Sequence, residues 1–150
     1  MTVGLVIVSH SARLAEGVAE LAGQMAQGKV VIVPAGGTAE GRLGTSVDKI
    51  LQALRQAANP SGVLILLDLG SAGIAAEMAL ELFRQDQECP VMISSAPLVE
   101  GAVVAAVEAS IGSPLQAVAE AAAAATSLPK LPSSAGGPAA EEMPPADQQT

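Results

Sequence analysis

Hydrophobic positions follow two kinds of pattern that alternate along the chain. Four short, nearly continuous apolar runs are rich in Val, Ile and Leu, which is typical of strands covered on both faces of a parallel sheet. They lie at residues 5–9, 29–33, 63–67 and 90–94. After each run, apolar residues recur every three or four positions, which predicts amphipathic helices. These helices are expected at residues 11–28, 47–58, 74–85, 97–112 and 114–126.

The first predicted helix shows the periodic pattern clearly. Four large apolar residues recur along it at spacings of three or four: Leu14, Val18, Leu21 and Met25. Ser11 is a suitable N-cap residue, because a serine hydroxyl accepts from a free N–H group of the first turn. Gly28 is a suitable stop signal.

Strand–helix alternation repeated four times predicts an α/β fold with a parallel sheet between helices. We expect one domain at residues 1–126, since 150 residues is an ordinary length for one domain. From residue 127 the sequence is rich in Pro, Ser, Gly and Ala, which predicts a disordered tail or linker over 127–150. In parallel sheets of this kind, functional sites form at the carboxyl ends of the strands.

Composition limits the classes of function. The net charge of -8, without basic clusters, argues against binding to nucleic acid or to an anionic membrane surface. One cysteine, Cys89, and one histidine are too few for a typical zinc site, and no intrachain disulfide is possible. The apolar run at residues 3–8 is too short for a signal peptide, so a cytoplasmic protein is expected.

His10 is the only histidine, and it stands between Ser9 and Ser11 where the first strand gives way to a helix. One interpretation is an ordinary exposed loop residue. The other is functional, because helix N-termini favour phosphate and imidazole, with a reference pKa of about 6.5, is a nucleophile near neutral pH. His10 would then accept a phosphoryl group, with Ser9 and Ser11 as loop residues around the phosphate.

Asp68 directly follows the third strand. It is either a simple helix cap or a partner of His10, and Ser71 is an alternative cap for the same helix. If the first and third strands are neighbours, the Asp68 carboxylate accepts from one ring N–H of His10. That bond would fix the tautomer and leave the other ring nitrogen as the nucleophile.

Two glycine-containing loops complete the candidate site. The loop at residues 34–46 lacks the Lys and Ser/Thr of a P-loop, and the chain has no G-x-G-x-x-G motif. This loop is either a flexible connection or a mobile wall over the site, with Gly37 and Thr38 near the phosphate and Arg42, Thr45 and Ser46 as further possible hydrogen-bond donors. The amides of Gly70 and Ser71 are placed to meet the same phosphate. The helix at 97–112 carries small apolar residues on several faces, which suggests burial against a second subunit.

Four segments, taken together and in order, resemble the phosphotransfer subunit of bacterial phosphoenolpyruvate-dependent dihydroxyacetone kinase. They are "VIVSHSARLAEG", "GGTAEGRLGTS", "LLDLGSAGIAAEMALE" and "APLVEGAVVAAV". The first domain of that subunit is similar to the mannose-type enzyme IIA of the sugar phosphotransferase system. The resemblance covers about residues 1–125.

The resemblance implies a cytoplasmic homodimer with strand order 2-1-3-4, in which His10 is phosphorylated and Asp68 lies beside it. It also implies that phosphate comes from the carrier protein HPr. The acceptor would be ADP on the nucleotide-binding subunit of the kinase, so that the regenerated ATP phosphorylates dihydroxyacetone. No cofactor of its own and no metal are implied.

Two departures from the family keep alternatives open. Some members continue through a linker into an HPr-like domain, so this chain either uses a separate HPr or is a piece of a longer protein. Ala72 stands where the mannose-type relatives have Pro, which favours the kinase over the sugar transporter. A transporter IIA component and, more distantly, a non-catalytic flavodoxin-like binding module remain the alternatives.

Overall fold

A computed structural model describes residues 1–131 of the chain. The elements, in chain order, are β1 (Gly4–Ser9), α1 (Ala12–Met25), β2 (Ile32–Gly36), α2 (Val47–Ala57), β3 (Val63–Leu67), α3 (Ala72–Phe83), β4 (Val91–Ser94), α4 (Leu98–Ser110), α5 (Leu115–Ala124) and a short 3₁₀ turn (Ala125–Ser127). All four strands are parallel, in the order β2-β1-β3-β4, which confirms the predicted fold class and strand order. Most of the predicted tail lies outside the described residues.

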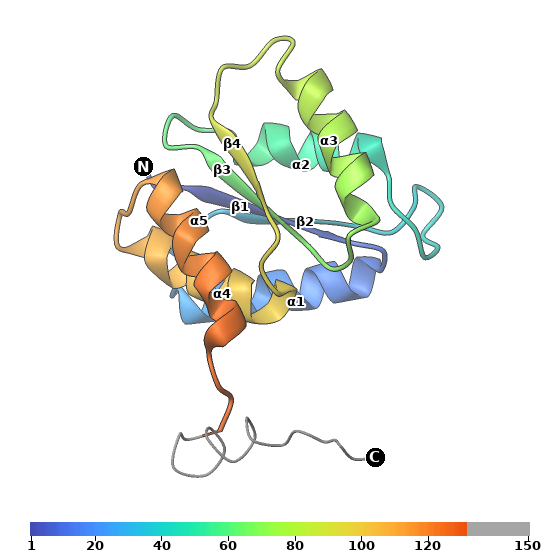
Figure 1. Cartoon of the computed structure of the whole chain (residues 1–150). Helices are drawn as coiled ribbons and strands as arrows, with labels where there is room; N and C mark the ends of the chain where they lie inside the picture. Colours follow the sequence, from blue (N-terminus) through green and yellow to red (C-terminus); the bar gives the residue numbers. More distant parts are fainter. Residues whose placement is uncertain (132–150) are drawn as a thin grey trace, which may run out of the picture.

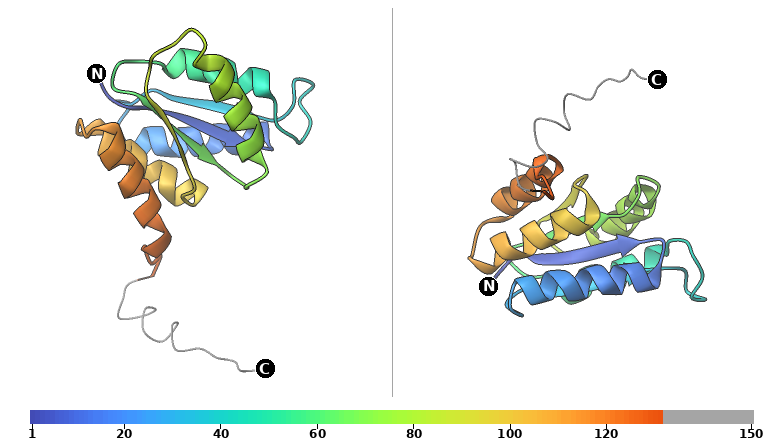
Figure 2. Two further views of the ribbon diagram at one scale, coloured as in Figure 1. Left: turned by 45° about the horizontal axis from the view of Figure 1, so that its top comes forward. Right: turned by 90° about the horizontal axis from the view of Figure 1, so that it is seen from below.

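The sheet lies between two layers of helices, with α1, α4 and α5 on one face and α2 and α3 on the other (Figures 1 and 2). The central strand β1 is buried on both faces. Its residues Leu5 and Ile7 pack under α1 and α4, while Val6 and Val8 pack under α2 and α3. This two-sided burial explains why β1 is a continuous apolar run rather than an alternating one.

The second strand lies three residues later than predicted, at Ile32–Gly36 instead of 29–33. Pro34 and Gly36 suggested a loop, but both are accommodated here. The N–H of Gly37 donates to Ser9, so by the alternation of a strand the nitrogen of Pro34 points to the open edge of the sheet, where a missing N–H costs nothing. A Cβ atom on Gly36 would lie 2.5 Å from the carbonyl oxygen of Ser11, so only glycine lets β2 approach α1 this closely.

The packed face of α1 differs from the one marked by its large apolar residues. Ala15, Val18 and Ala22 are buried, whereas Leu14, Leu21 and Met25 are 43–54% exposed. Small side chains bring α1 close to the sheet and to α4, so the alanines rather than the leucines contact the core.

The small residues of α4 are also used inside the chain. Ala102, Ala105, Ala106 and Ala109 are fully buried, and α4 packs against α1 and α5. The apolar character of α4 therefore reflects intrachain packing and does not by itself indicate a second subunit. Among residues 1–131, no helix has both the length and the apolar character needed to cross a membrane.

Candidate functional site

The site lies at the carboxyl edge of the sheet, where β1 and β3 end side by side. Val8 of β1 is in register with Leu67 of β3, so the residues that follow these strands meet. The N–H of Asp68 donates to the carbonyl of Val8 at 3.1 Å. His10 and Asp68, 58 residues apart in sequence, are thereby brought into contact.

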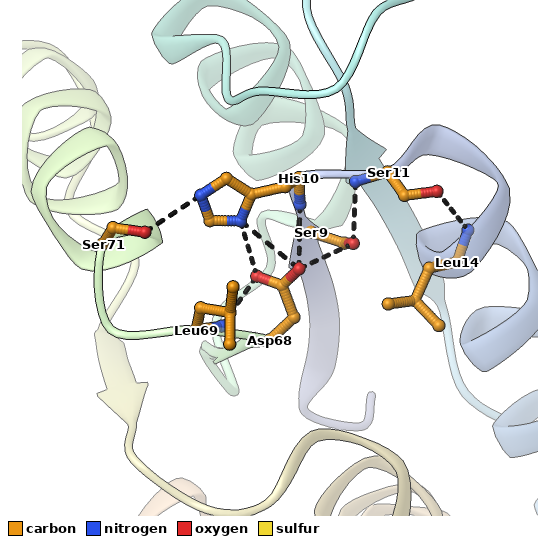
Figure 3. Close-up of polar contacts among 7 residues, drawn as sticks. All are labelled: Ser9, His10, Ser11, Leu14, Asp68, Leu69 and Ser71. Carbon is orange, nitrogen blue, oxygen red and sulfur yellow. Dashed lines mark hydrogen bonds and ion pairs between the residues drawn. The ribbon is translucent and has the colours of Figure 1, made fainter.

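Asp68 accepts hydrogen bonds from four groups (Figure 3). Its Oδ2 accepts from the Ser9 hydroxyl at 3.0 Å and from the main-chain N–H of His10 at 2.9 Å. Its Oδ1 lies 3.1 Å from Nδ1 of His10 and accepts from the N–H of Leu69 at 2.7 Å. Burial raises the pKa of this carboxyl group, but the bonds from His10, Ser9 and Leu69 outweigh it and hold the pKa below its ordinary value. Asp68 is thus an ionised acceptor at neutral pH.

The carboxylate determines how the imidazole of His10 is used. An ionised carboxylate only accepts, so Nδ1 must carry the proton that faces it. The lone pair is then on Nε2, which points away from Asp68 toward the start of α3 (Figure 3). The His10 side chain is 28% exposed and that of Asp68 is 11% exposed, so the nucleophile is accessible while its partner is covered.

Ser71 contacts this second ring nitrogen. Its Oγ lies 3.0 Å from Nε2 of His10, so the hydroxyl donates to the lone pair. The suggestion that Ser71 caps α3 is wrong in one respect: it occupies the N-cap position, but its side chain makes no capping bond. Gly70 and Ser71 nonetheless directly precede α3, and Ser71 lies beside the imidazole.

The two serines that flank His10 have their hydroxyls engaged within the protein. Ser9 is fully buried, and its Oγ donates to Asp68 and accepts from the N–H of Ser11 at 3.0 Å. Ser11 caps α1 as predicted, accepting from the N–H of Leu14 at 3.1 Å. Their roles around a phosphate stay predictions; in the structure they hold Asp68 and the start of α1 in place.

The loop after β2 lies against the main chain of the site rather than against the imidazole. Gly37, with a φ of +76°, donates its N–H to the carbonyl of Ser9. The hydroxyl of Thr38 accepts from the N–H of Arg42 at 3.1 Å and is used inside the loop. Gly44 also belongs to the site, although it was not predicted: its N–H donates to the carbonyl of His10 at 2.8 Å. A glycine in a glycine-rich loop gives no signal that singles it out.

A cavity of about 290 Å³ lies between the loops that follow β3 and β4, and His10 does not line it. Its lining includes Asp68, Gly70, Ser94 and Pro97. Within the described residues, no three His, Cys, Asp or Glu side chains gather closely enough to hold a metal ion. The site brings together an oriented imidazole, a carboxylate, a hydroxyl and a helix start.

Comparison with known proteins gives a consistent picture. Residues 4–119 match the family model of the PTS system fructose IIA component, EIIA-man. The chain is 41% identical over 119 residues to the PEP-dependent dihydroxyacetone kinase phosphoryl donor subunit DhaM of Escherichia coli K12, which covers 77% of this chain but 25% of that protein. It is 38% identical over 116 residues to the phosphoryl donor subunit DhaM of dihydroxyacetone kinase 2 of Listeria innocua, covering 77% of this chain and 93% of that protein.

Among solved structures, the unknown-function protein EF1359 superposes with a TM-score of 0.71 and 33% sequence identity, over 82% of this chain and 94% of that one. The chain spans about a quarter of the length of the Escherichia coli relative and nearly all of the Listeria relative. The chain belongs to the EIIA-man family of PTS fructose IIA components, in the branch that contains the DhaM phosphoryl donor subunits.

Proposed function

We propose that the chain is a phosphohistidine carrier that accepts a phosphoryl group on Nε2 of His10 and donates it onward. The observation that carries this proposal is the contact of the Asp68 carboxylate with Nδ1, which leaves Nε2 as the exposed nucleophile. The similar proteins are named as phosphoryl donor subunits, which supports the same chemistry.

In the proposed step, the lone pair of Nε2 forms a bond to phosphorus while the P–N bond of the donor breaks, and its electron pair stays on the donor nitrogen. The ring becomes cationic, and Asp68 stabilises that charge through the Nδ1–H bond. The ring needs no bound cofactor, because the imidazole itself is the acceptor. Return of the electron pair to Nε2 releases the phosphoryl group to the next acceptor.

Ser71 changes its partner in this cycle. In the unphosphorylated protein its hydroxyl donates to Nε2. Once Nε2 is bonded to phosphorus, we expect the same hydroxyl and the N–H groups of Gly70 and Ser71 to donate to phosphoryl oxygens, as helix starts do for phosphate. Gly37 and Thr38 remain candidates for contact only if the loop moves toward the ring.

The donor we propose is HPr, and the acceptor is ADP held on the nucleotide-binding subunit of dihydroxyacetone kinase, in the cytoplasm. The relatives' names, which refer to dihydroxyacetone kinase, support this acceptor over a sugar-specific IIB protein of a transporter. Free ADP should be a poor acceptor, because only a partner holds its β-phosphate in line with Nε2.

The test is phosphorylation from phosphoenolpyruvate with enzyme I and HPr. We expect one acid-labile, base-stable phosphate per chain and none on His10→Ala; labelling of that variant would show that another residue is modified. The phosphoprotein should then be discharged by the ADP-loaded kinase subunit. Discharge by a sugar-specific IIB protein, with no response to the kinase subunit, would reject the kinase assignment and leave His10 as the carrier.

We also propose that the chain forms a homodimer through α3 and the open edge of β4. Ile74, Met78 and Leu82 recur every fourth residue on α3 and are 68%, 52% and 42% exposed, which is an apolar stripe on one face. Met78→Glu should shift the molar mass from dimer to monomer in light scattering. Val31→Glu, at a site 55% exposed elsewhere, is the control and should leave the dimer intact.

A further inference from the structure

Two arginines beside the site have no partner within the described residues. Of the seven Lys and Arg side chains of the chain, four donate to an acceptor within the described residues: those of Lys49, Arg55, Arg84 and Lys130. Arg13, Lys29 and Arg42 do not within residues 1–131. Lys29 lies between the end of α1 and the start of β2, away from the carboxyl ends of the strands. Arg13 and Arg42 belong to the two segments that adjoin His10.

Arg13 stands where the helix itself disfavours a cation. It lies in the first turn of α1, two residues after the N-cap Ser11 and three after His10. The partial positive charge of a helix N-terminus favours Asp or Glu there, and α1 has no acidic residue in that turn. A local choice that opposes helix stability is expected where function requires the residue.

Arg42 is carried by a turn whose main chain is fixed next to His10. The N–H of Thr38 donates to the carbonyl of Arg42 at 2.9 Å, and the N–H of Arg42 donates back to the Thr38 hydroxyl. Two residues later, the N–H of Gly44 donates to the carbonyl of His10. The exposed Arg42 side chain thus belongs to a turn whose main chain is bonded to that of His10.

The charge balance of the site explains what these cations would bind. Asp68 is already ionised beside the ring, and a phosphoryl group brings a further charge of about −1.5 to −2. A guanidinium matches phosphate oxygens with two parallel N–H donors, which an ammonium does not. A chain with a net charge of -8 attracts basic partner surfaces, and two arginines that pair with no acidic group within the described residues would repel such a surface. A phosphoryl group between the two proteins would remove that repulsion.

We propose that Arg13 and Arg42 together bind the phosphoryl group while it passes between His10 and a partner protein. The inference rests on the proposed carrier function. The contacts are hydrogen bonds and leave the step itself unchanged: the new N–P bond forms at Nε2 as the donor's P–N bond breaks, and both guanidinium groups keep their protons. The phosphate is held either on His10 or on the partner, and one experiment separates these two sources.

The experiment measures phosphotransfer from phosphorylated HPr by rapid quench for Arg13→Gln, Arg42→Gln and Arg42→Lys. Arg55→Gln is the matched control, because Arg55 lies in the last turn of α2, away from His10, and pairs with Asp86. We expect each Gln variant to lower kcat by roughly tenfold or more, as for a lost hydrogen bond to a charged group, with little change in KM. Arg42→Lys should lie between, and Arg55→Gln should match the unmodified protein.

The isolated phosphoprotein shows where the group is held. If the arginines bind it on His10, the Gln variants shift its phosphorus-31 resonance and hydrolyse faster; if they bind it on the partner, only kcat changes. A rise in KM alone that disappears at high salt would overturn the inference, since it would indicate general attraction between surfaces. So would unchanged kinetics in both variants when the unmodified protein is labelled normally on His10.

Stability provides the check on folding. Arg13→Gln removes a cation from a helix start, so its urea midpoint should equal or exceed that of the unmodified protein while its kcat falls. If the midpoint and kcat fall together, Arg13 is structural and the inference is wrong. Failure of the unmodified protein to take up phosphate on His10 would instead reject the proposed carrier function, and the inference with it.

Discussion

The Asp68→Asn substitution keeps the size of the side chain and removes one of its two acceptor oxygens. Both oxygens are in use: Oδ2 accepts from Ser9 at 3.0 Å and from the N–H of His10 at 2.9 Å, and Oδ1 accepts from Leu69 at 2.7 Å and from Nδ1 of His10 at 3.1 Å. An amide has one oxygen, so its NH₂ group faces a pair of donors whichever way it turns.

Either orientation impairs the imidazole. With the NH₂ group toward Nδ1, the ring must accept there and carry its proton on Nε2, which removes the nucleophile. With the oxygen toward Nδ1, the tautomer is kept but the negative charge that stabilises the cationic ring is lost. We expect phosphotransfer to slow by at least about 100-fold, the lower end for a positioned proton-handling group, which corresponds to about 2.7 kcal/mol of activation free energy.

The assay is single-turnover transfer from phosphorylated HPr at saturating concentration, with nitrogen-15 NMR of the His10 ring to identify the protonated nitrogen. Asp86→Asn is the control, because Asp86 is an exposed aspartate paired only with Arg55. A folded Asp68→Asn protein with an unchanged rate would refute the argument. It would leave Asp68 as a structural acceptor for the main chain of the loop.

Three further predictions follow from single contacts. Hydrogen bonds hold the pKa of Asp68 below its ordinary value of 3.8, so the stability that its charge contributes is present above that pH and declines in more acid solution. Urea melts of the unmodified protein and of Asp68→Asn should therefore converge below pH 3.8, and a constant difference between them would contradict this. Ser71→Ala loses a hydrogen bond to neutral Nε2 in the resting protein and a stronger one to the charged phosphoryl group during transfer. The two bonds differ by about 1.5 kcal/mol, so transfer should slow roughly tenfold. An accelerated rate would show that the hydroxyl only blocks Nε2. Gly36→Ala should destabilise the fold by about 1–3 kcal/mol in urea melts, because its Cβ would lie 2.5 Å from the carbonyl oxygen of Ser11. Gly17→Ala, with no atom within 4 Å of the added Cβ, should instead stabilise the fold by about 0.5–1 kcal/mol. Equal effects would show that the contact at Gly36 relaxes freely.

The strands at the centre of the sheet could be predicted from sequence because burial on both faces leaves a direct signature. β1 and β3 are continuous runs of branched apolar residues, and the structure ends them at the predicted residues. The edge strand β2 could not be placed in the same way. Pro34 and Gly36 are local signals for a loop, and they are tolerated only because of tertiary facts, the open edge and the close approach of α1.

The prediction of which face of α1 is buried was wrong for a related reason. Periodicity weights large side chains, so Leu14, Leu21 and Met25 seemed to define the buried face, but the face that contacts the core is made of alanines and Val18. Close helix packing selects small residues. A sequence pattern carries no information about the distance between two elements, and that distance decides which face is buried.

Position predicted the contact between His10 and Asp68 only on the condition that the first and third strands are neighbours, because both residues follow strands and neighbouring parallel strands end at the same edge. The adjacency of the two strands, however, came from family resemblance rather than from periodicity. Neither strand position nor family resemblance predicted that the Ser71 hydroxyl contacts the ring. Its place at a helix start favours capping statistically, whereas in the structure its hydroxyl faces the imidazole, a choice that depends on where the ring lies.

The position of β1 between β2 and β3 explains how the main chain of a lone histidine is held in place. The N–H of the His10 peptide is held by Asp68 from the loop after β3, and its carbonyl is held by Gly44 from the loop after β2. Both neighbours of the central strand thus fix the main chain of the nucleophile, and Asp68 fixes the ring through the same carboxylate. Orientation is supplied by topology and main-chain bonds, so Nε2 needs no permanent partner and remains available for a group that arrives and departs.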